Sequence, residues 1–210
     1  TDSIRMEDGS GLTAPFADPA LTWSTFLGGS GGDFAQNMAV DATGNIYMVG
    51  YSDADWGSPQ RAFTSGNDAY VAKFNSSGAL LWNTFLGGGG DDIGLSIIVS
   101  GSNVYVVGYS NDTWDCSPVT CTVNAYALGY DAFAAKLDSS GNVSWITFLG
   151  SNGADFGRGI AVDGSGNIYL AGASDGTWGA PIQSHAGGDY DGFVAKLDST
   201  GALTWNTFQG

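Results

Sequence analysis

Residues 22–29 read TWSTFLGG, and close copies of this stretch return three times along the chain. The copies are LWNTFLGG at 81–88, SWITFLGS at 144–151 and TWNTFQG at 204–210. Their tryptophans are Trp23, Trp82, Trp145 and Trp205, which stand 59, 63 and 60 residues apart. Self-similarity at a fixed period is typical of architectures in which one supersecondary unit stacks on the next. The spacing therefore predicts a repeat protein.

Each unit offers four short segments, A to D, that are rich in β-branched and aromatic residues and bounded by Gly, Asn, Asp and Ser, which is typical of strands. In the first unit they are residues 34–41, 45–52, 69–75 and 79–86. Turns such as DATGN and DSSGN join A to B and C to D. In them Asp can bond the backbone two residues on and Gly takes positive φ at little cost.

Four antiparallel strands per unit predict an all-β chain built from β-propeller-type repeats. Three four-stranded blades of about sixty residues are expected, with one surplus outer strand at the N-terminal end. The expected parts are an N-terminal arm at 1–20, a surplus strand D at 21–29, and blades at 30–88, 89–150 and 151–210.

Calcium is the alternative reading of the glycine-rich links. Residues 26–36, FLGGSGGDFAQ, are close to the nonapeptide of calcium-loaded β-helices, but that fold needs the motif in successive turns, and here its relatives begin only at Phe85 and Phe148. The Asp-Gly turns carry one carboxylate each, whereas calcium usually takes roughly six to eight oxygen ligands. We interpret these stretches as blade links and hairpin turns.

An aspartate recurs where each strand A begins, at Asp33, Asp92 and Asp155. Three carboxylates at one depth near a central axis could gather a cation such as Ca²⁺; the alternative is that they cap turns and pair with neighbouring groups. No other cofactor is expected.

The composite pattern D-x-x-G-N-I/V-Y, D-A-F-V-A-K-L-D-S-S-G and W-x-T-F-L-G-G resembles the bacterial β-propeller repeat family known as SBBP, over residues 21–210. The resemblance implies blades of a propeller in secreted or surface-attached bacterial proteins, mostly without an assigned activity. The second unit departs from the pattern, with SGSN at 100–103 in place of the D-x-x-G-N turn.

The amino-acid composition limits the classes of partner that are expected for this chain. The chain has 210 residues, of which 43% are hydrophobic and 13% aromatic, enough to build a core. Its formal net charge of −15 repels phosphate backbones, so no nucleic-acid partner is expected. No run approaches the roughly 18 apolar residues of a membrane span and no basic-then-apolar leader precedes Thr1, so no membrane insertion is expected.

Cys116 and Cys121 lie in the stretch WDCSPVTC, inside a loop insertion of the second unit. Their spacing is not C-x-x-C and a zinc site would need further ligands, so a small disulfide is favoured over free thiols. A disulfide favours an oxidising compartment. Together with the family resemblance, it predicts an extracellular or cell-surface protein.

Two further side-chain types repeat in register. Lys73, Lys136 and Lys196 occupy the same place in segment C, where each is expected to lay its stem over aromatic rings and pair with a carboxylate. Trp56, Trp114 and Trp178 lie in the loops between B and C. They could emerge on one rim and bind a sugar or a protein, or each could fold back and cover its own sheet.

An enzyme would normally break the repeat with a catalytic group at one position, and the main asymmetries here are the cysteine loop, His185 and Arg158. A lone histidine is more often a loop residue than a catalyst. We therefore expect no enzymatic activity.

Assembly is the main functional prediction, because closed propellers need about four to eight blades and this chain supplies three. The surplus strand at 21–29 would pair with another copy through Leu21, Trp23, Phe26 and Leu27. A homo-oligomer is expected, an open extracellular filament ahead of a closed ring. The alternative is a ring that binds glycans or proteins through aromatic loops.

Overall fold

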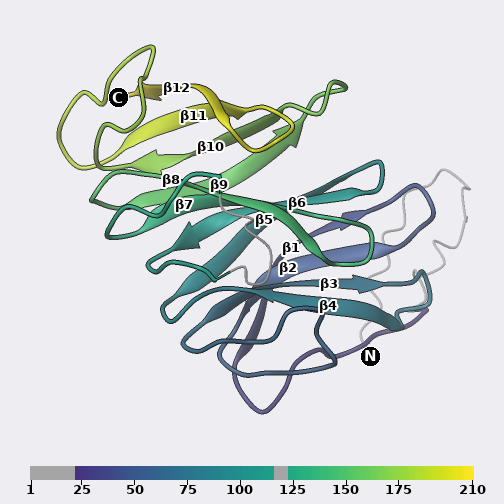
Figure 1. Cartoon of the computed structure of the whole chain (residues 1–210). Helices are drawn as coiled ribbons and strands as arrows, with labels where there is room; N and C mark the ends of the chain where they lie inside the picture. The colour runs from purple at the N-terminus through teal and green to yellow at the C-terminus, as the bar shows by residue number, and fades with distance from the viewer. Residues whose placement is uncertain (1–21, 116–122) are drawn as a thin grey trace, which may run out of the picture.

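A computed structural model describes residues 22–115 and 123–210, which form three four-stranded antiparallel sheets (Figure 1). The first sheet contains β1 (Asp33–Val40), β2 (Ile46–Ser52), β3 (Asp68–Phe74) and β4 (Leu80–Leu86). The second contains β5 (Asp92–Ser100), β6 (Asn103–Ser110), β7 (Asp131–Leu137) and β8 (Val143–Leu149). The third contains β9 (Asp155–Val162), β10 (Ile168–Ser174), β11 (Asp191–Leu197) and β12 (Leu203–Gln209). The prediction of an all-β fold with β-propeller-type repeats is confirmed.

Each sheet is one sequence unit, with its strands in chain order, and we call the sheets blades 1, 2 and 3. Figure 1 shows the blades stacked in a row, with blade 2 between the other two. The first strand of each following blade, β5 or β9, packs against the blade before it. The described residues contain no helix with the length and apolar character that crossing a membrane would require.

The surplus strand is not formed within the chain. Residues 22–29 carry no strand pairing with any described strand, and Leu21 and the proposed arm lie outside the described residues. A β-strand needs a neighbour for its backbone N–H and C=O groups. The neighbour for this segment would be the third strand of a blade that precedes blade 1.

The predicted Asp-Gly turns are present and explain why the strands end where they do. Asp41 accepts hydrogen bonds from the backbone amides of Thr43 and Asn45, both at 2.9 Å, and Gly44 has φ of +83°. In the corresponding turn of blade 3, hydrogen bonds from Asn167 lower the pKa of Asp163 to about 2. Blade 2 replaces this turn by a shorter one, since β5 ends at Ser100 and β6 begins at Asn103.

Most of the core lies between blades, and a third buried cluster, around Trp56 and Tyr70, lies within blade 1. One buried cluster joins blade 1 to blade 2 and includes Val49, Leu86, Val106 and Phe133. A second joins blade 2 to blade 3 and includes Val107, Leu149, Leu170 and Phe193. Each blade is too thin to bury its own two faces, so the stacking of neighbours supplies most of the hydrophobic stabilisation.

Candidate functional site

Each blade is tied to the next by a tryptophan of its last strand. The indole Nε1 of Trp82 donates to the carbonyl of Ser139 at 3.1 Å, and that of Trp145 donates to the carbonyl of Ser199 at 3.3 Å. The ring of Trp82 lies on Gly141, where a β-carbon would stand 2.7 Å from the indole and where φ is +87°. Only glycine meets both demands. We call this tryptophan-on-turn contact a latch.

The N-terminal segment forms the same latch on blade 1. The indole Nε1 of Trp23 donates to the carbonyl of Ser76 at 3.2 Å, and its ring lies on Gly78, where a β-carbon would stand 2.6 Å away. Leu27 packs against the cluster around Trp56, as expected for a counterpart of the buried leucines of β4 and β8. Residues 22–29 therefore occupy the place that the last strand of a preceding blade would take.

Phe26 is the exception in this segment, because its side chain is 97% exposed. Its counterparts in the repeat are buried: Phe85 is 0%, Phe148 is 3% and Phe208 is 0% exposed. Each counterpart packs edge-on against the loop tryptophan of its own blade. Phe26 thus occupies a core position of the motif, although its side chain is exposed within the described residues.

At each end of the row of blades, one face of the last sheet is not covered by a neighbouring blade. On the outer side of blade 1, Met38 and Val40 of β1 are exposed, whereas β5 and β9 are largely covered by the preceding blade. On the outer side of blade 3, Ala171, Gly192 and Val194 are exposed. Their counterparts in blade 2 are Val107, Ala132 and Ala134, which are fully buried. We call these surfaces the first face and the last face.

Buried carboxyl groups mark one end of every blade. Asp92, Ser110 and Asp131 stand opposite one another in β5, β6 and β7, and Ser110 Oγ donates to Asp92. The same row recurs in blade 1 (Asp33, Ser52, Asp68) and in blade 3 (Asp155, Ser174, Asp191). The aspartates at the start of strand A were predicted. Those at the start of strand C were missed, although they open DAYVAK, DAFAAK and DGFVAK.

The rows meet in pairs across the blade junctions. A β-carbon on Gly150 would stand 2.5 Å from Asp131 Oδ1 and 2.8 Å from Asp155 Oδ2, so the two carboxyls flank this glycine. Burial raises the pKa of Asp131 to about 6, and Asp155 adds to the rise. Asp131 Oδ1 has no hydrogen-bond partner, while Oδ2 accepts from the amide of Ala127 at 2.6 Å.

The junction of blades 1 and 2 has the same pair with a cation added. Asp68 and Asp92 flank Gly87, and burial raises the pKa of Asp68 to about 6. The guanidinium of Arg61 lowers that pKa in part, and it donates to the carbonyl of Gly87 at 2.7 Å. In blade 2 the place of Arg61 is taken by Asn124, so the second junction has no such cation at this position.

The structure does not bring Asp33, Asp92 and Asp155 together as a metal site. They lie in three sheets, and each accepts a hydrogen bond from a serine of its own blade. Within residues 22–115 and 123–210, no group of three or more His, Cys, Asp or Glu side chains could hold a metal ion. The alternative, that these carboxyls pair with neighbouring groups, describes their geometry.

The loop tryptophans do not project from a rim, which corrects the binding interpretation of Trp56, Trp114 and Trp178. All three are buried. Each packs edge-on against an aromatic ring of strand C and the phenylalanine of strand D. The loops fold back because an indole contributes far more when it covers the sheet than when it faces water.

Of the two contacts predicted for the repeated lysines, the contact with aromatic rings is present. The ammonium groups of Lys73, Lys136 and Lys196 lie 4.9, 5.7 and 5.5 Å from the centres of tyrosine rings on the neighbouring strand. Lys73 and Lys136 also stand opposite the latch tryptophans Trp82 and Trp145, and Lys196 stands opposite Trp205. No ion pair of these lysines occurs among the described residues, and their pairing with a carboxylate stays a prediction.

The remaining candidate residues are the two cysteines and His185. Cys116 and Cys121 lie outside the described residues, and the disulfide stays a prediction. His185 Nε2 is 3.9 Å from Asp191 Oδ2, and the ring is packed against Phe208.

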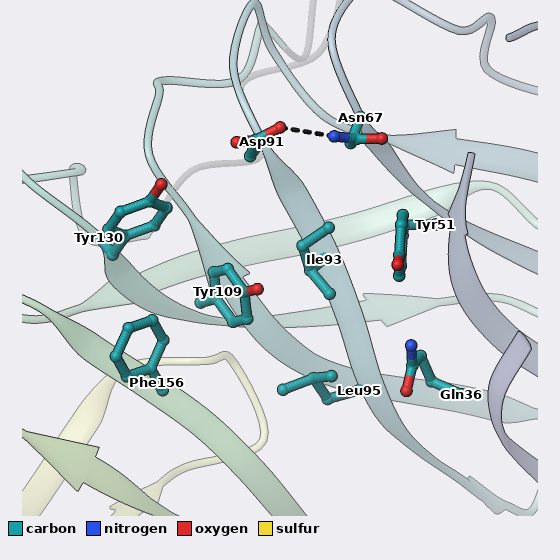
Figure 2. A pocket seen from close by; sticks show the side chains of 9 residues that line it. All are labelled: Gln36, Tyr51, Asn67, Asp91, Ile93, Leu95, Tyr109, Tyr130 and Phe156. Carbon is teal, nitrogen blue, oxygen red and sulfur yellow. Dashed lines mark hydrogen bonds between the residues drawn. The ribbon is translucent and has the colours of Figure 1, made fainter. Parts of the chain in front are cut away.

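A pocket of about 540 Å³ opens where the first strands of the three blades meet (Figure 2). Figure 2 shows Ile93 and Leu95 on its floor strand, with Tyr51 and Gln36 on one side and a group of aromatic rings on the other. That group is Tyr109, Tyr130 and Phe156. At the edge, the amide of Asn67 donates to Asp91 Oδ1 at 2.6 Å. Burial raises the pKa of Tyr109, so its phenol stays protonated at neutral pH.

Blades that stack through their first strands, close each junction with a tryptophan latch and place an aromatic pocket along those strands define a β-propeller-type repeat protein. Residues 22–55 and 144–177 match the SBBP family, which is described as a beta-propeller repeat. These two segments of the chain are therefore similar to SBBP repeats. Each match runs from a latch tryptophan through the first two strands of the following blade. No curated protein matches the chain.

Proposed function

We propose that the protein is a non-catalytic structural subunit that assembles by blade completion. In this assembly, residues 22–29 of one copy serve as the last strand of blade 3 in the preceding copy. The observation that carries the proposal is Phe26, which is 97% exposed although its segment is latched to blade 1. An aromatic side chain of this size in water, at a position that is otherwise core, indicates a partner that covers it.

The donated strand has an equivalent to replace. Residues 22–27, TWSTFL, and 204–209, TWNTFQ, share the tryptophan, both threonines and the phenylalanine in the same register. Replacing β12 by the incoming segment would put Phe26 in the place of Phe208, against Trp178. Exchange of equivalent elements between copies is a low-cost route to assembly, because it reuses contacts that the chain already makes.

Leu27 favours the incoming segment over β12 at the junction between copies. The corresponding leucines, Leu86 and Leu149, are buried at the internal junctions, and Leu27 already packs on blade 1. In β12 this place is held by Gln209. Gln209 is exposed in the single chain, and burying its polar amide costs free energy that burying a leucine does not.

Donation from the first blade of one copy to the last blade of the next is a heterologous contact. Such contacts build an open filament unless the rotation closes, and two copies would supply the six blades of a closed ring. We favour the filament. The family resemblance and the predicted disulfide support an extracellular or cell-surface location.

Deleting residues 1–29 is expected to abolish assembly and to leave the β-sheet circular dichroism signal in place, because the three blades keep all twelve described strands. Sedimentation velocity and negative-stain imaging measure the assembly. The matched control deletes only residues 1–21, which keeps Trp23, Phe26 and Leu27 and should still assemble. Persistent or stronger assembly after the longer deletion would show that the segment is not the donor.

The pocket supports a second candidate function, binding of a neutral glycan. Aromatic rings can stack on the apolar faces of sugars, and the pocket combines Tyr109, Tyr130 and Phe156 with the polar groups of Gln36 and Asn67. This differs from binding through the loop tryptophans, whose rings are buried.

Tyr109→Ala is expected to abolish glycan-array binding by the full-length chain, if the pocket is a sugar site. Tyr190→Ala is the matched control, since Tyr190 lies near Phe156 but does not line the pocket. An array on which the unmodified protein gives no signal, or on which both variants bind equally, would remove this candidate and leave assembly as the function.

A further inference from the structure

The internal blade junctions share a tight contact between a glycine and a valine. A β-carbon on Gly94 of β5 would stand 2.5 Å from Val49 Cγ2 and 3.4 Å from Ala69 Cβ of blade 1. A β-carbon on Gly157 of β9 would stand 2.5 Å from Val107 Cγ2 and 3.5 Å from Ala132 Cβ of blade 2. The valine occupies the space where a residue larger than glycine would need its methyl group.

On the first face, the residue at the glycine position of this contact is larger, and on the last face, the residue at the valine position is smaller. On the first face, the counterpart of Gly94 and Gly157 is Ala35, which adds a methyl group. On the last face, the counterpart of Val49 and Val107 is Ala171, which removes the two γ-methyl groups. The counterpart of Ala69 and Ala132 is Gly192, which removes one more carbon. The last face therefore lacks the methyl carbons with which the β-carbon of Ala35 would clash.

Backbone groups at the two ends match as well. At the internal junction of blades 2 and 3, the amide of Tyr130 donates to the carbonyl of Gly153 at 2.8 Å, and the amide of Asp155 donates to the carbonyl of Tyr130 at 2.6 Å. The counterpart of Tyr130 before β11 is Tyr190, and that of Gly153 before β1 is Gly31. A second copy placed in sequence would bring Tyr190 and Gly31 together in the same way.

We propose that the last face of one copy packs directly on the first face of the next, with Ala35 seated against Ala171 and Gly192. The partner is a second copy of this chain, and the junction between copies repeats the internal junction with its methyl groups redistributed. The inference rests on the proposed blade completion, in which residues 22–29 provide the strand beside this contact, and it adds which faces meet and in which order.

Exchanging the methyl groups tests the contact. Ala171→Val restores the valine of the internal junctions and should weaken assembly at least about tenfold, because overpacking a close contact is destabilising. Ala35→Gly in the same chain should restore assembly to near the original strength, since the pair then equals Gly94 with Val49. Both positions are exposed in the single chain, and valine suits a strand, so folding should be unchanged.

The assay is the dependence of assembly on concentration, measured by sedimentation velocity, with the melting temperature of each variant as the folding check. Ser144→Val on β8 is the matched control, because it adds valine at an exposed strand position in the central blade, away from the proposed Ala35 contact. Weakening by Ala171→Val with rescue by Ala35→Gly supports the contact.

Three outcomes overturn the inference and separate it from the proposed function. If deletion of residues 1–29 abolishes assembly but Ala171→Val has no effect, blade completion stands and the face contact is wrong. The same holds if Ala171→Val weakens assembly and Ala35→Gly does not rescue it. If the unmodified chain is a monomer at all concentrations, both the proposed function and the face contact are wrong.

Discussion

Phe148→Ala is expected to lower the free energy of unfolding by about 3–5 kcal/mol, the usual cost of removing a buried phenylalanine. Phe148 is 3% exposed, and its ring packs against Trp114 at 5.4 Å and Tyr126 at 5.9 Å between centroids. The side chain lies in the cluster that joins blades 1 and 2. Removing it therefore leaves a cavity at a junction that both blades need.

Phe26→Ala is the matched comparison, because Phe26 fills the same position of the W-x-T-F motif. In the single chain it should change the free energy of unfolding by less than about 0.5 kcal/mol, as exposed substitutions usually do. Urea denaturation at a concentration that keeps the chain monomeric measures both variants. Equal losses would mean that Phe26 is covered within one chain, and the case for strand donation would fail.

A second large effect is expected with pH: the melting temperature should be highest in the mildly acidic range, near pH 4, and should fall as the pH rises towards 6. Burial raises the pKa of Asp68 and of Asp131 to about 6 from 3.8. Between these values the unfolded chain loses protons that the folded chain keeps, so unfolding becomes more favourable as the pH rises. Below pH 4 the trend reverses, because hydrogen bonds in turns lower the pKa of groups such as Asp163.

Asp131→Asn isolates the cause. The amide stays neutral at every pH, its oxygen can accept from Ala127, and its nitrogen can donate towards Asp155, so the melting temperature at pH 7.5 should rise by a few degrees. At pH 4 the gain should vanish. Calorimetry across this range measures it.

Asp68→Asn is the control, and it should gain less, because the guanidinium of Arg61 already favours the ionised form of Asp68. A melting temperature that rises steadily from pH 4 to pH 8 would contradict the assignment of the buried carboxyls.

The sequence predicted the blades well because their signals are local. Asp41 and Gly44 favour a turn through their own side-chain and backbone chemistry, and the repeated tryptophan sets the period. The strand bounds in blade 1 therefore agree with the expected ones to within one residue. Blade 2 departs locally at Ser100–Asn103, and its turn is shorter as a result.

The candidate site was predicted less well because its signals are not local. The tryptophans Trp56, Trp114 and Trp178 fall in loops, and nothing in a loop sequence says whether an indole faces water or its own sheet. The buried aspartates of strand C gain their character from a neighbouring blade, as Asp131 does from Asp155. The match between Ala35 and Ala171 appears only once Gly94 is seen against Val49.

The latches also determine how the molecule can come apart. Blade 2 is held on both sides, by Trp82 on its own turn and by Trp145 on the turn of blade 3. Coupling of this kind acts only between nearest neighbours, so opening should begin at the ends of the row and reach the middle last. Joining copies end to end would turn every terminal blade into a middle one. Polymerisation would then protect the terminal blades of each subunit against local opening, and the fibre would be more stable than a single subunit.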